Sequence, residues 1–141
     1  MIKKIVFDGN DGTGKSFRLN EMKKIFPTLE YEDRGIFSEM TLNENIFKKV
    51  ENSDTNAVCD KVKELYKFYN HIAEDSTTLY IICDTTPEIC QKRISVRGDS
   101  LDEEYHRMED LIKFRERFNV LYYFVKELPN VMMVDTSDDI I

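Results

Sequence analysis

The sequence predicts an α/β domain with a small parallel sheet of about four strands and helices on both faces. Short β-branched apolar runs alternate with longer segments of helical periodicity along all 141 residues, which is typical of such a fold. The chain also has no internal repeat, low-complexity tract or linker rich in proline and glycine. We therefore expect one domain, residues 1–141.

The first elements flank a glycine-rich segment. Ile2–Asp8 is a β-branched run typical of a buried strand. Ser16–Phe26 carries apolar residues at helical spacing, and Pro27 ends this helix because proline disfavours helical dihedrals in the residue before it. Thr28–Glu32 is a weaker candidate strand.

The middle of the chain is predicted to be mainly helical. Asn43–Val50 is one candidate helix, and a second, capped by Asp54 or Thr55, runs to about Ala73. The apolar residues of the second helix recur every three or four positions, so we expect them to be buried. They are Val58, Val62, Leu65, Tyr66, Tyr69 and Ile72.

The last third of the chain returns to alternating strands and helices. Thr77–Asp84 is the clearest strand, and Pro87–Arg97 is a helix that begins at a proline. A polar break, Gly98–Asp102, separates it from a long predicted helix, Glu103–Leu128. Val131–Asp135 is the last strand.

The composition excludes several classes of protein. A net charge of −7 and an isoelectric point near 4.9 disfavour a broad basic surface for nucleic acid. No apolar run is long enough to cross a bilayer or to act as a signal peptide, and the three cysteines form no CxxC pair. We therefore expect a cytoplasmic protein with reduced thiols, and the sequence leaves open whether it forms a homodimer.

The segment between the first strand and helix, Gly9–Ser16, matches the pattern G-x-x-x-x-G-K-[ST] of a phosphate-binding loop, or P-loop. Backbone N–H groups of such a loop curl around phosphate oxygens, and its glycines leave room for that close approach. The following helix presents its positive N-terminal end to the same phosphates. We therefore expect ATP to bind here, with Lys15 on the β- and γ-phosphates and the Ser16 hydroxyl on Mg²⁺.

A longer stretch, Phe7–Ser16, resembles the F-E-G-x-D-G-x-G-K-T segment of thymidylate kinases, with Asp8 in place of the usual glutamate. The resemblance implies a P-loop NTPase fold and ATP-dependent phosphoryl transfer to a small nucleotide acceptor, a deoxynucleoside monophosphate. It also implies that Asp11 faces this acceptor. The residues expected to contact ATP are Asn10, Asp11, Gly12, Thr13, Gly14, Lys15, Ser16 and Phe17.

A second segment of the resemblance is Asp33–Ser38, which is similar to the family's D-R-Y-x-x-S. It implies that Asp33 orients Mg²⁺ or the acceptor phosphate, and that Arg34 and Ser38 contact the acceptor. An arginine suits this role because its planar guanidinium pairs with two phosphate oxygens. Gly35 stands where the family has an aromatic residue. Asp84, after an apolar strand, is the rival candidate for the metal, although a structural or capping role fits it better.

The third segment runs from Pro87 to Gly98 and resembles the lid helix of thymidylate kinases, P-E-x-x-x-x-R-I-x-x-R-G. It implies a lid at about residues 98–104, with Arg93 and Arg97 placed to stabilise charge on the transferred phosphoryl group. Arg107 is a weaker candidate, because acidic residues are equally frequent in this region and provide partners on helix faces. His106 has no metal-like partner spacing, so we expect it at the surface or its boundary.

Thymidylate kinases carry a further strand and helix where this chain has only Pro27–Glu32. This shortening leaves the acceptor open. The leading hypothesis is a kinase of deoxynucleoside monophosphates. The alternatives are a kinase of a nucleoside, or of a modified base or end of a polynucleotide, and a non-catalytic nucleotide-binding regulator. Asp11, Asp33 and a basic lid favour transfer, because a regulator would not need them.

Overall fold

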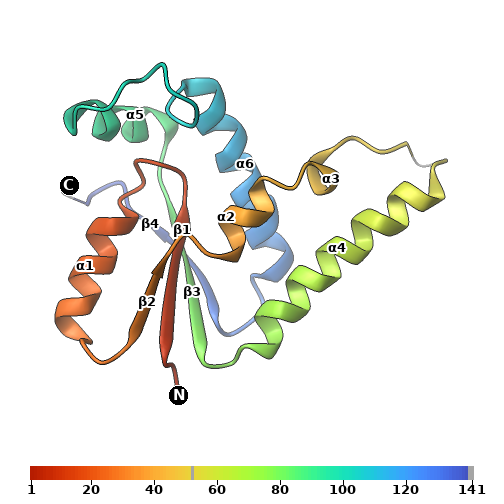
Figure 1. The fold of residues 1–141 in the computed structure, drawn as a ribbon, viewed down its shortest axis with the longest axis horizontal. Coiled ribbons are helices and arrows are strands. Elements are labelled where there is room, and N and C mark those ends of the chain that lie inside the picture. Colours follow the sequence, from red (N-terminus) through yellow and green to blue (C-terminus); the bar gives the residue numbers. More distant parts are fainter. Residues whose placement is uncertain (52, 140–141) are drawn as a thin grey trace.

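A computed structural model describes residues 1–51 and 53–139 (Figure 1). Four strands form one parallel sheet in the order β2-β1-β3-β4. Their bounds are β1 Lys4–Gly9, β2 Glu30–Asp33, β3 Thr78–Asp84 and β4 Val131–Asp135. The predicted α/β class with a small parallel sheet of four strands is confirmed.

Alternating side chains of the central strands divide the core into two layers. Val6, Tyr80 and Ile82 point to one face, and Phe7 and Ile81 point to the other. Because both faces of β1 and β3 are covered, these strands contain nearly continuous apolar runs.

Six helices connect and cover the strands in the described part of the chain (Figure 1). One face of the sheet packs against α1, and the other against α2, α4 and α6. The helix α5 lies near the carboxyl edge of the sheet and packs against α6. The bounds are α1 Lys15–Ile25, α2 Ile36–Thr41, α3 Glu44–Phe47, α4 Thr55–Glu74, α5 Pro87–Val96 and α6 Met108–Val125.

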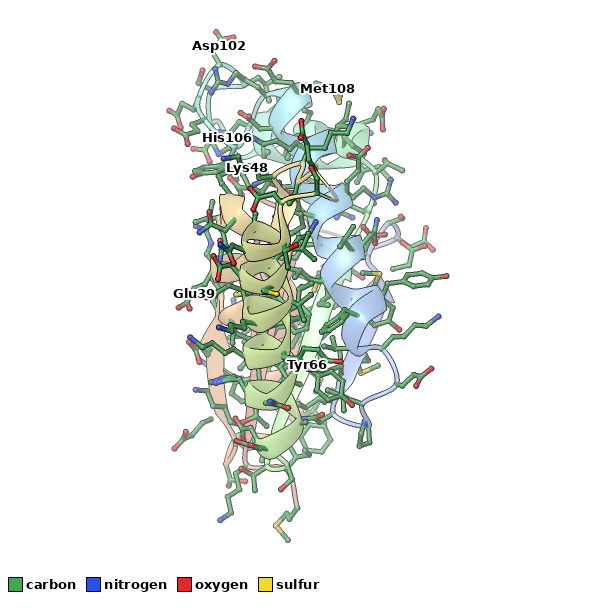
Figure 2. The ribbon with its side chains drawn as sticks, turned by 90° about the vertical axis from the view of Figure 1, so that its right-hand side faces the viewer. Glu39, Lys48, Tyr66, Asp102, His106 and Met108 are labelled. Atoms are coloured by element: carbon green, nitrogen blue, oxygen red, sulfur yellow. The ribbon has the colours of Figure 1, made fainter. Side chains whose placement is uncertain are left out.

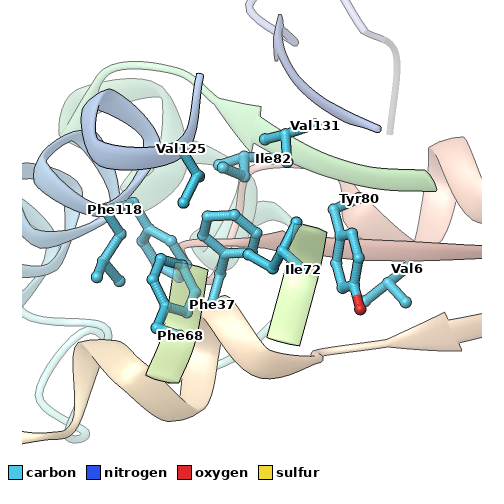
Figure 3. Close-up of a cluster of buried hydrophobic side chains, with 10 residues drawn as sticks. Val6, Phe37, Phe68, Ile72, Tyr80, Ile82, Phe118, Val125 and Val131 are labelled. Carbon is cyan, nitrogen blue, oxygen red and sulfur yellow. The ribbon is translucent and has the colours of Figure 1, made fainter. Parts of the chain in front are cut away.

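The larger core cluster is centred on Phe37 of α2 (Figure 3). Its ring meets Phe68 of α4 edge-on with 5.0 Å between centroids, and Tyr80 of β3 at 6.1 Å. Phe118 and Ile82 belong to the same cluster, so helices α2, α4 and α6 share one apolar layer over the sheet.

The apolar stripe predicted for α4 is buried only toward its C-terminal end. Of the predicted residues, Ile72 is buried, whereas Val58, Val62 and Tyr66 are exposed. Phe68, which was not among them, is also buried. The first half of α4 extends away from the sheet, and Figure 2 shows this helix in front with Tyr66 on the side facing α6. Helical spacing gives the apolar face of a helix but not how far the core beneath it reaches.

Three further boundaries differ from the sequence-based prediction. The helix predicted from Glu103 begins only at Met108, because Tyr105 has a φ of 70° that an α-helix cannot contain. The polar break before it therefore extends through residue 107. The helix predicted over Asn43–Val50 is limited to the four residues of α3. No bounds were predicted for α2, which lay within the segment expected to be mainly helical.

Within the described residues, none of the helices combines the length and apolar character that crossing a bilayer requires.

We expect Phe37→Ala to lower the free energy of unfolding by about 3–5 kcal/mol, because it leaves a cavity in the shared apolar layer. Tyr123→Ala is the control, since Tyr123 is 71% exposed, and should change stability by less than about 0.5 kcal/mol. Urea denaturation of both variants measures the difference. Equal effects would contradict the central position of Phe37.

Candidate functional site

The carboxyl ends of the four strands lie at one edge of the sheet, and the P-loop connects β1 to α1 there (Figure 1). Gly12 has a φ of 82°, and a Cβ on it would lie 2.6 Å from the carbonyl oxygen of Cys90 in α5. Only glycine permits both the left-handed backbone and this close approach. The loop is therefore held against α5 as well as against the sheet.

Lys15 begins α1 and is almost fully buried in the P-loop. Its Nζ donates to the carbonyl oxygens of Gly9 at 3.0 Å and Asn10 at 2.9 Å. Burial lowers the pKa of the Lys15 ammonium, and the nearby positive charge of Arg34 adds to this effect. The ammonium thus lies inside a ring of backbone groups at a helix N-terminus, where an anion is favoured.

The side chains of two other residues that were predicted to contact ATP point into the protein. The Asn10 side chain donates to the carbonyl oxygen of Leu111 at 2.7 Å, and the Thr13 hydroxyl to that of Asn10 at 2.6 Å. Both side chains thus fix the shape of the loop, which leaves their backbone groups for any contact with a ligand.

Asp33, at the end of β2, lies beside the P-loop because β2 pairs with β1 in register at Phe7. The Ser16 hydroxyl donates to Asp33 Oδ2 at 3.4 Å. These two oxygens are ligands of the kind that Mg²⁺ prefers, with phosphate oxygens and water completing the shell. Among the described residues, no group of three or more His, Cys, Asp and Glu side chains forms a metal cage. The donor set therefore fits a magnesium ion held jointly with a phosphate.

The rival candidate for the metal, Asp84, ends β3 and makes a different contact. Its carboxylate pairs with the guanidinium of Arg115 on α6 at 3.0 and 3.2 Å. The structure thus puts Asp33, and not Asp84, beside the Ser16 hydroxyl.

Asp8 links the P-loop strand to the segment that follows β2. Its side chain is 1% exposed, and its Oδ1 accepts hydrogen bonds from Gly35 N at 2.8 Å and from Ser38 N and Oγ. Burial raises the pKa of the Asp8 carboxyl, although the bonds from Ser38 and Gly35 oppose the shift.

A Cβ on Gly35 would lie 2.3 Å from Val6 Cγ1, which explains why no aromatic residue stands there.

Arg93 of α5 lies between the P-loop and the segment after β4. Its guanidinium donates to the carbonyl oxygens of Gly12 at 3.4 Å, Thr136 at 2.6 Å and Asp139 at 3.1 Å. Arg93 lines the same pocket as Lys15 and Ser16, but its contacts are those of a residue that fixes the surrounding loops.

Arg97, at the C-terminal end of α5, forms an ion pair with Asp11 of the P-loop. Its Nη2 lies 2.9 Å from both carboxylate oxygens, and its Nε is 2.5 Å from Asp99. His106 Nε2 lies 2.5 Å from Asp11 Oδ2. Burial alone would raise the pKa of Asp11, but Arg97, Lys15 and His106 together lower it below its ordinary value.

These contacts bear on two predictions. That Asp11 faces the acceptor stays a prediction, and its carboxylate pairs with Arg97 and lies beside His106. His106 was expected at the surface or its boundary, but it is 7% exposed and contacts the P-loop. No local pattern indicates this contact, because 95 positions separate the two residues in the chain. Arg107 pairs with Asp110 at 3.1 Å and does not line the phosphate side.

Two adjoining pockets open at this edge of the sheet and share Asp11, Lys15 and Arg34. The smaller pocket, about 220 Å³, contains almost all the residues predicted for phosphate and metal. It is lined by Asp11, Gly12, Gly14, Lys15, Ser16, Phe17, Asp33, Arg34, Arg93 and Arg97. The larger pocket, about 520 Å³, includes Ser38, Glu39, Thr41 and Leu42 near α2, and Glu104, Tyr105, His106, Phe114 and Phe118 near α6.

No known protein-family model matches the sequence, and no curated protein sequence matches it. Solved structures do match the fold. A deoxyadenosine kinase from M. mycoides with bound dCTP superimposes with a TM-score of 0.63 at 16% identity, covering 97% of this chain and 92% of that one. The same enzyme with bound dATP gives a TM-score of 0.60 at 18% identity, with coverage of 96% and 92%. Both of these structures are of a deoxyadenosine kinase, so the likeness that they show does not single out thymidylate kinases.

Asp8 generates a prediction for the pH dependence of stability. Its raised pKa means that the native state binds this proton more tightly than the unfolded chain does, so ionisation of Asp8 opposes folding. Its stabilising contribution is present at low pH and is lost as the pH rises through the folded-state pKa.

We therefore expect the stability of the wild type relative to Asp8→Asn to decrease as the pH rises from about 4 to about 7. Urea denaturation of both proteins across this range measures the difference, and the variant cancels the titration of all other groups. A difference that is constant or grows with pH would contradict the prediction.

Proposed function

We propose that this protein is a kinase that transfers the γ-phosphoryl group of ATP-Mg to a nucleoside-type acceptor. The observation that carries the proposal is the pair of pockets that meet at Lys15. A phosphate bound in the smaller pocket would lie next to a molecule in the larger one, which is the arrangement that in-line transfer requires.

The smaller pocket has the chemistry of a donor site. Its cations are Lys15, Arg34, Arg93 and Arg97, and they outnumber its two carboxylates. Mg²⁺, held by Ser16 and Asp33 with phosphate oxygens, would neutralise charge on the leaving phosphates. Lys15 would bind the β- and γ-phosphates, and Arg97 would supply further positive charge once it leaves Asp11.

The larger pocket has the chemistry of an uncharged acceptor. Beyond the residues that it shares with the donor pocket, its lining includes the carboxylates of Glu39 and Glu104 and the imidazole of His106, without any Lys or Arg among the described residues. Carboxylates accept hydrogen bonds from sugar hydroxyls and repel a phosphate dianion. Phe114 and Phe118 add apolar surface of the kind that packs on a base. The similarity to deoxyadenosine kinases supports the same choice of a nucleoside.

A deoxynucleoside monophosphate is the second candidate, and Arg34 favours it. This arginine lines both pockets, where it could pair with an acceptor phosphate. The two acceptors give Arg34 different roles. With a monophosphate acceptor, Arg34 would bind the acceptor's own phosphate before transfer. With a nucleoside acceptor, it would mainly stabilise negative charge on the transferred phosphoryl group.

The metal side of the proposal predicts that Asp33→Asn lowers kcat at least about a hundredfold, because a charged group next to the ion is lost. Asp84→Asn is the matched control: it removes the ion pair with Arg115 and should mainly reduce stability. Turnover and urea denaturation of both variants distinguish the roles. The reverse pattern would show that Asp84 of β3, and not Asp33 of β2, supports the metal.

The acceptor is tested by measuring ATP consumption with deoxynucleosides, their monophosphates and a short oligonucleotide. We expect turnover with at least one deoxynucleoside and none with Lys15→Ala, which lacks the cation at the β- and γ-phosphates. Arg34→Ala should then lower kcat more than it raises the acceptor's KM.

Turnover of monophosphates alone, with a raised acceptor KM in Arg34→Ala, would favour the second candidate. If no acceptor stimulates ATP consumption, or if Lys15→Ala keeps full turnover, the proposal of a kinase fails.

A further inference from the structure

The ring of His106 bridges two parts of the site that are distant in the sequence. Its Nδ1 lies 2.8 Å from the carbonyl oxygen of Ser100, in the connection between α5 and α6, and its Nε2 lies 2.5 Å from Asp11 Oδ2 in the P-loop. The side chain lies at the same end of the molecule as Asp102 and Met108 (Figure 2). One buried imidazole therefore joins this connection to the phosphate-binding loop.

Both neighbours of the ring are hydrogen-bond acceptors. A backbone carbonyl has no proton to donate, so Nδ1 must carry one. Asp11 is an ionised carboxylate, because Arg97 pairs with it and its pKa lies below the ordinary value. Nε2 must then also carry a proton. Acceptors at both ring nitrogens suit a doubly protonated imidazolium, whereas a neutral ring would turn a lone pair toward Ser100 O or toward the carboxylate.

The connection held by this ring forms one wall of the larger pocket. Glu104, Tyr105 and His106 all line that pocket. Tyr105 has a left-handed backbone, which is unfavourable for a tyrosine and persists only where its surroundings impose it. The Gln91 side chain of α5 also donates to the backbone oxygen of His106 at 3.3 Å. His106 thus attaches this wall to the P-loop directly, beside Arg97, which binds both Asp11 and Asp99.

We propose that His106 is a positioning residue, whose imidazolium form clamps the connection between α5 and α6 onto Asp11 and so fixes the wall of the larger pocket. When the ring loses one of its two protons, a lone pair faces either the carbonyl oxygen of Ser100 or the carboxylate of Asp11, so one of the two contacts is lost and the wall is released. The part of the proposal that concerns acceptor binding rests on the proposed function, whereas the clamp itself does not.

The charged groups around this pair come from several neighbouring elements, and Lys15 of the P-loop adds a positive charge that lowers the pKa of Asp11. Arg97 of α5 binds the same carboxylate as His106, so it competes for Asp11 but also keeps it ionised. Glu103, on the connection, lies 3.7 Å from Nδ1 and favours the charged ring. At the start of α6, Arg107 and Asp110 pair with each other.

The first test detects the two ring protons directly by NMR of protein with isotopically labelled histidine. The chain has two histidines, and the exposed His71 serves as an internal control. At about pH 6 we expect two slowly exchanging N–H signals from His106, which His106→Gln removes, and none from His71. A single N–H signal, or none, from His106 would overturn the clamp.

The second test follows the wall of the pocket as the pH is raised until one His106 ring proton is lost. Hydrogen exchange of the amides of residues 99–107, corrected for intrinsic rates, should then accelerate about tenfold or more, while the amides of α6 stay protected. His106→Gln should show fast exchange of this segment at every pH. The same acceleration in the variant, or constant protection in the wild type, would overturn the proposal.

The third test connects the clamp to activity. Over the same pH range, the acceptor's KM should rise at least about fivefold in the wild type and stay high and constant in His106→Gln, with little change in the KM for ATP. His71→Gln should behave as the wild type. A rise that persists in His106→Gln would show that another group controls acceptor binding. If no acceptor is turned over, the proposed function fails, and the NMR and exchange results still decide the clamp.

Discussion

The buried ammonium of Lys15 is the constraint on which the rest of the site depends. A charge out of water is costly unless it is paired and hydrogen-bonded, and here its contacts are the carbonyl oxygens of Gly9 and Asn10. The partial charges of these carbonyl oxygens offset only part of the cost of burying the ammonium, and a bound phosphate would offset the rest. The loop must therefore keep its curled shape in advance of binding. The contact of Gly12 with α5 and the inward hydrogen bonds of Asn10 and Thr13 maintain that shape.

Arg93 of α5 and Arg97, just after it, have different electrostatic roles. Arg93 donates to backbone carbonyl oxygens and links the segment after β4 to the P-loop, so its positive charge is held in one position. Arg97 is more exposed and pairs with a single P-loop carboxylate, which a phosphate could replace as its partner. The same carboxylate binds His106. Asp11 is thus the junction between the phosphate side of the site and the wall of the larger pocket.

The short connection between α1 and β2 affects the larger pocket. With no additional strand and helix after α1, the segment following β2 lines this pocket directly, together with the P-loop and residues near α6. Asp8 makes this possible by binding the start of α2 through Gly35 and Ser38, and the close packing of Gly35 on Val6 brings that segment against β1. The buried carboxylate costs stability at neutral pH, which is consistent with a role in shaping the site rather than in stabilising the fold.

The sequence alone determined the features that depend on local chemistry. The P-loop and the four strands follow from short patterns, because backbone dihedrals and strand alternation act over a few residues. The position of Asp33 beside the P-loop was implied by the resemblance to thymidylate kinases. Tertiary structure alone decided which charges meet. The pairing of Asp84 with Arg115, the use of Arg93 on carbonyls and the contact of His106 with Asp11 each join residues more than 30 positions apart. It also decided that half of the apolar stripe of α4 stays exposed, because burial depends on where the core ends and not on the period of the helix.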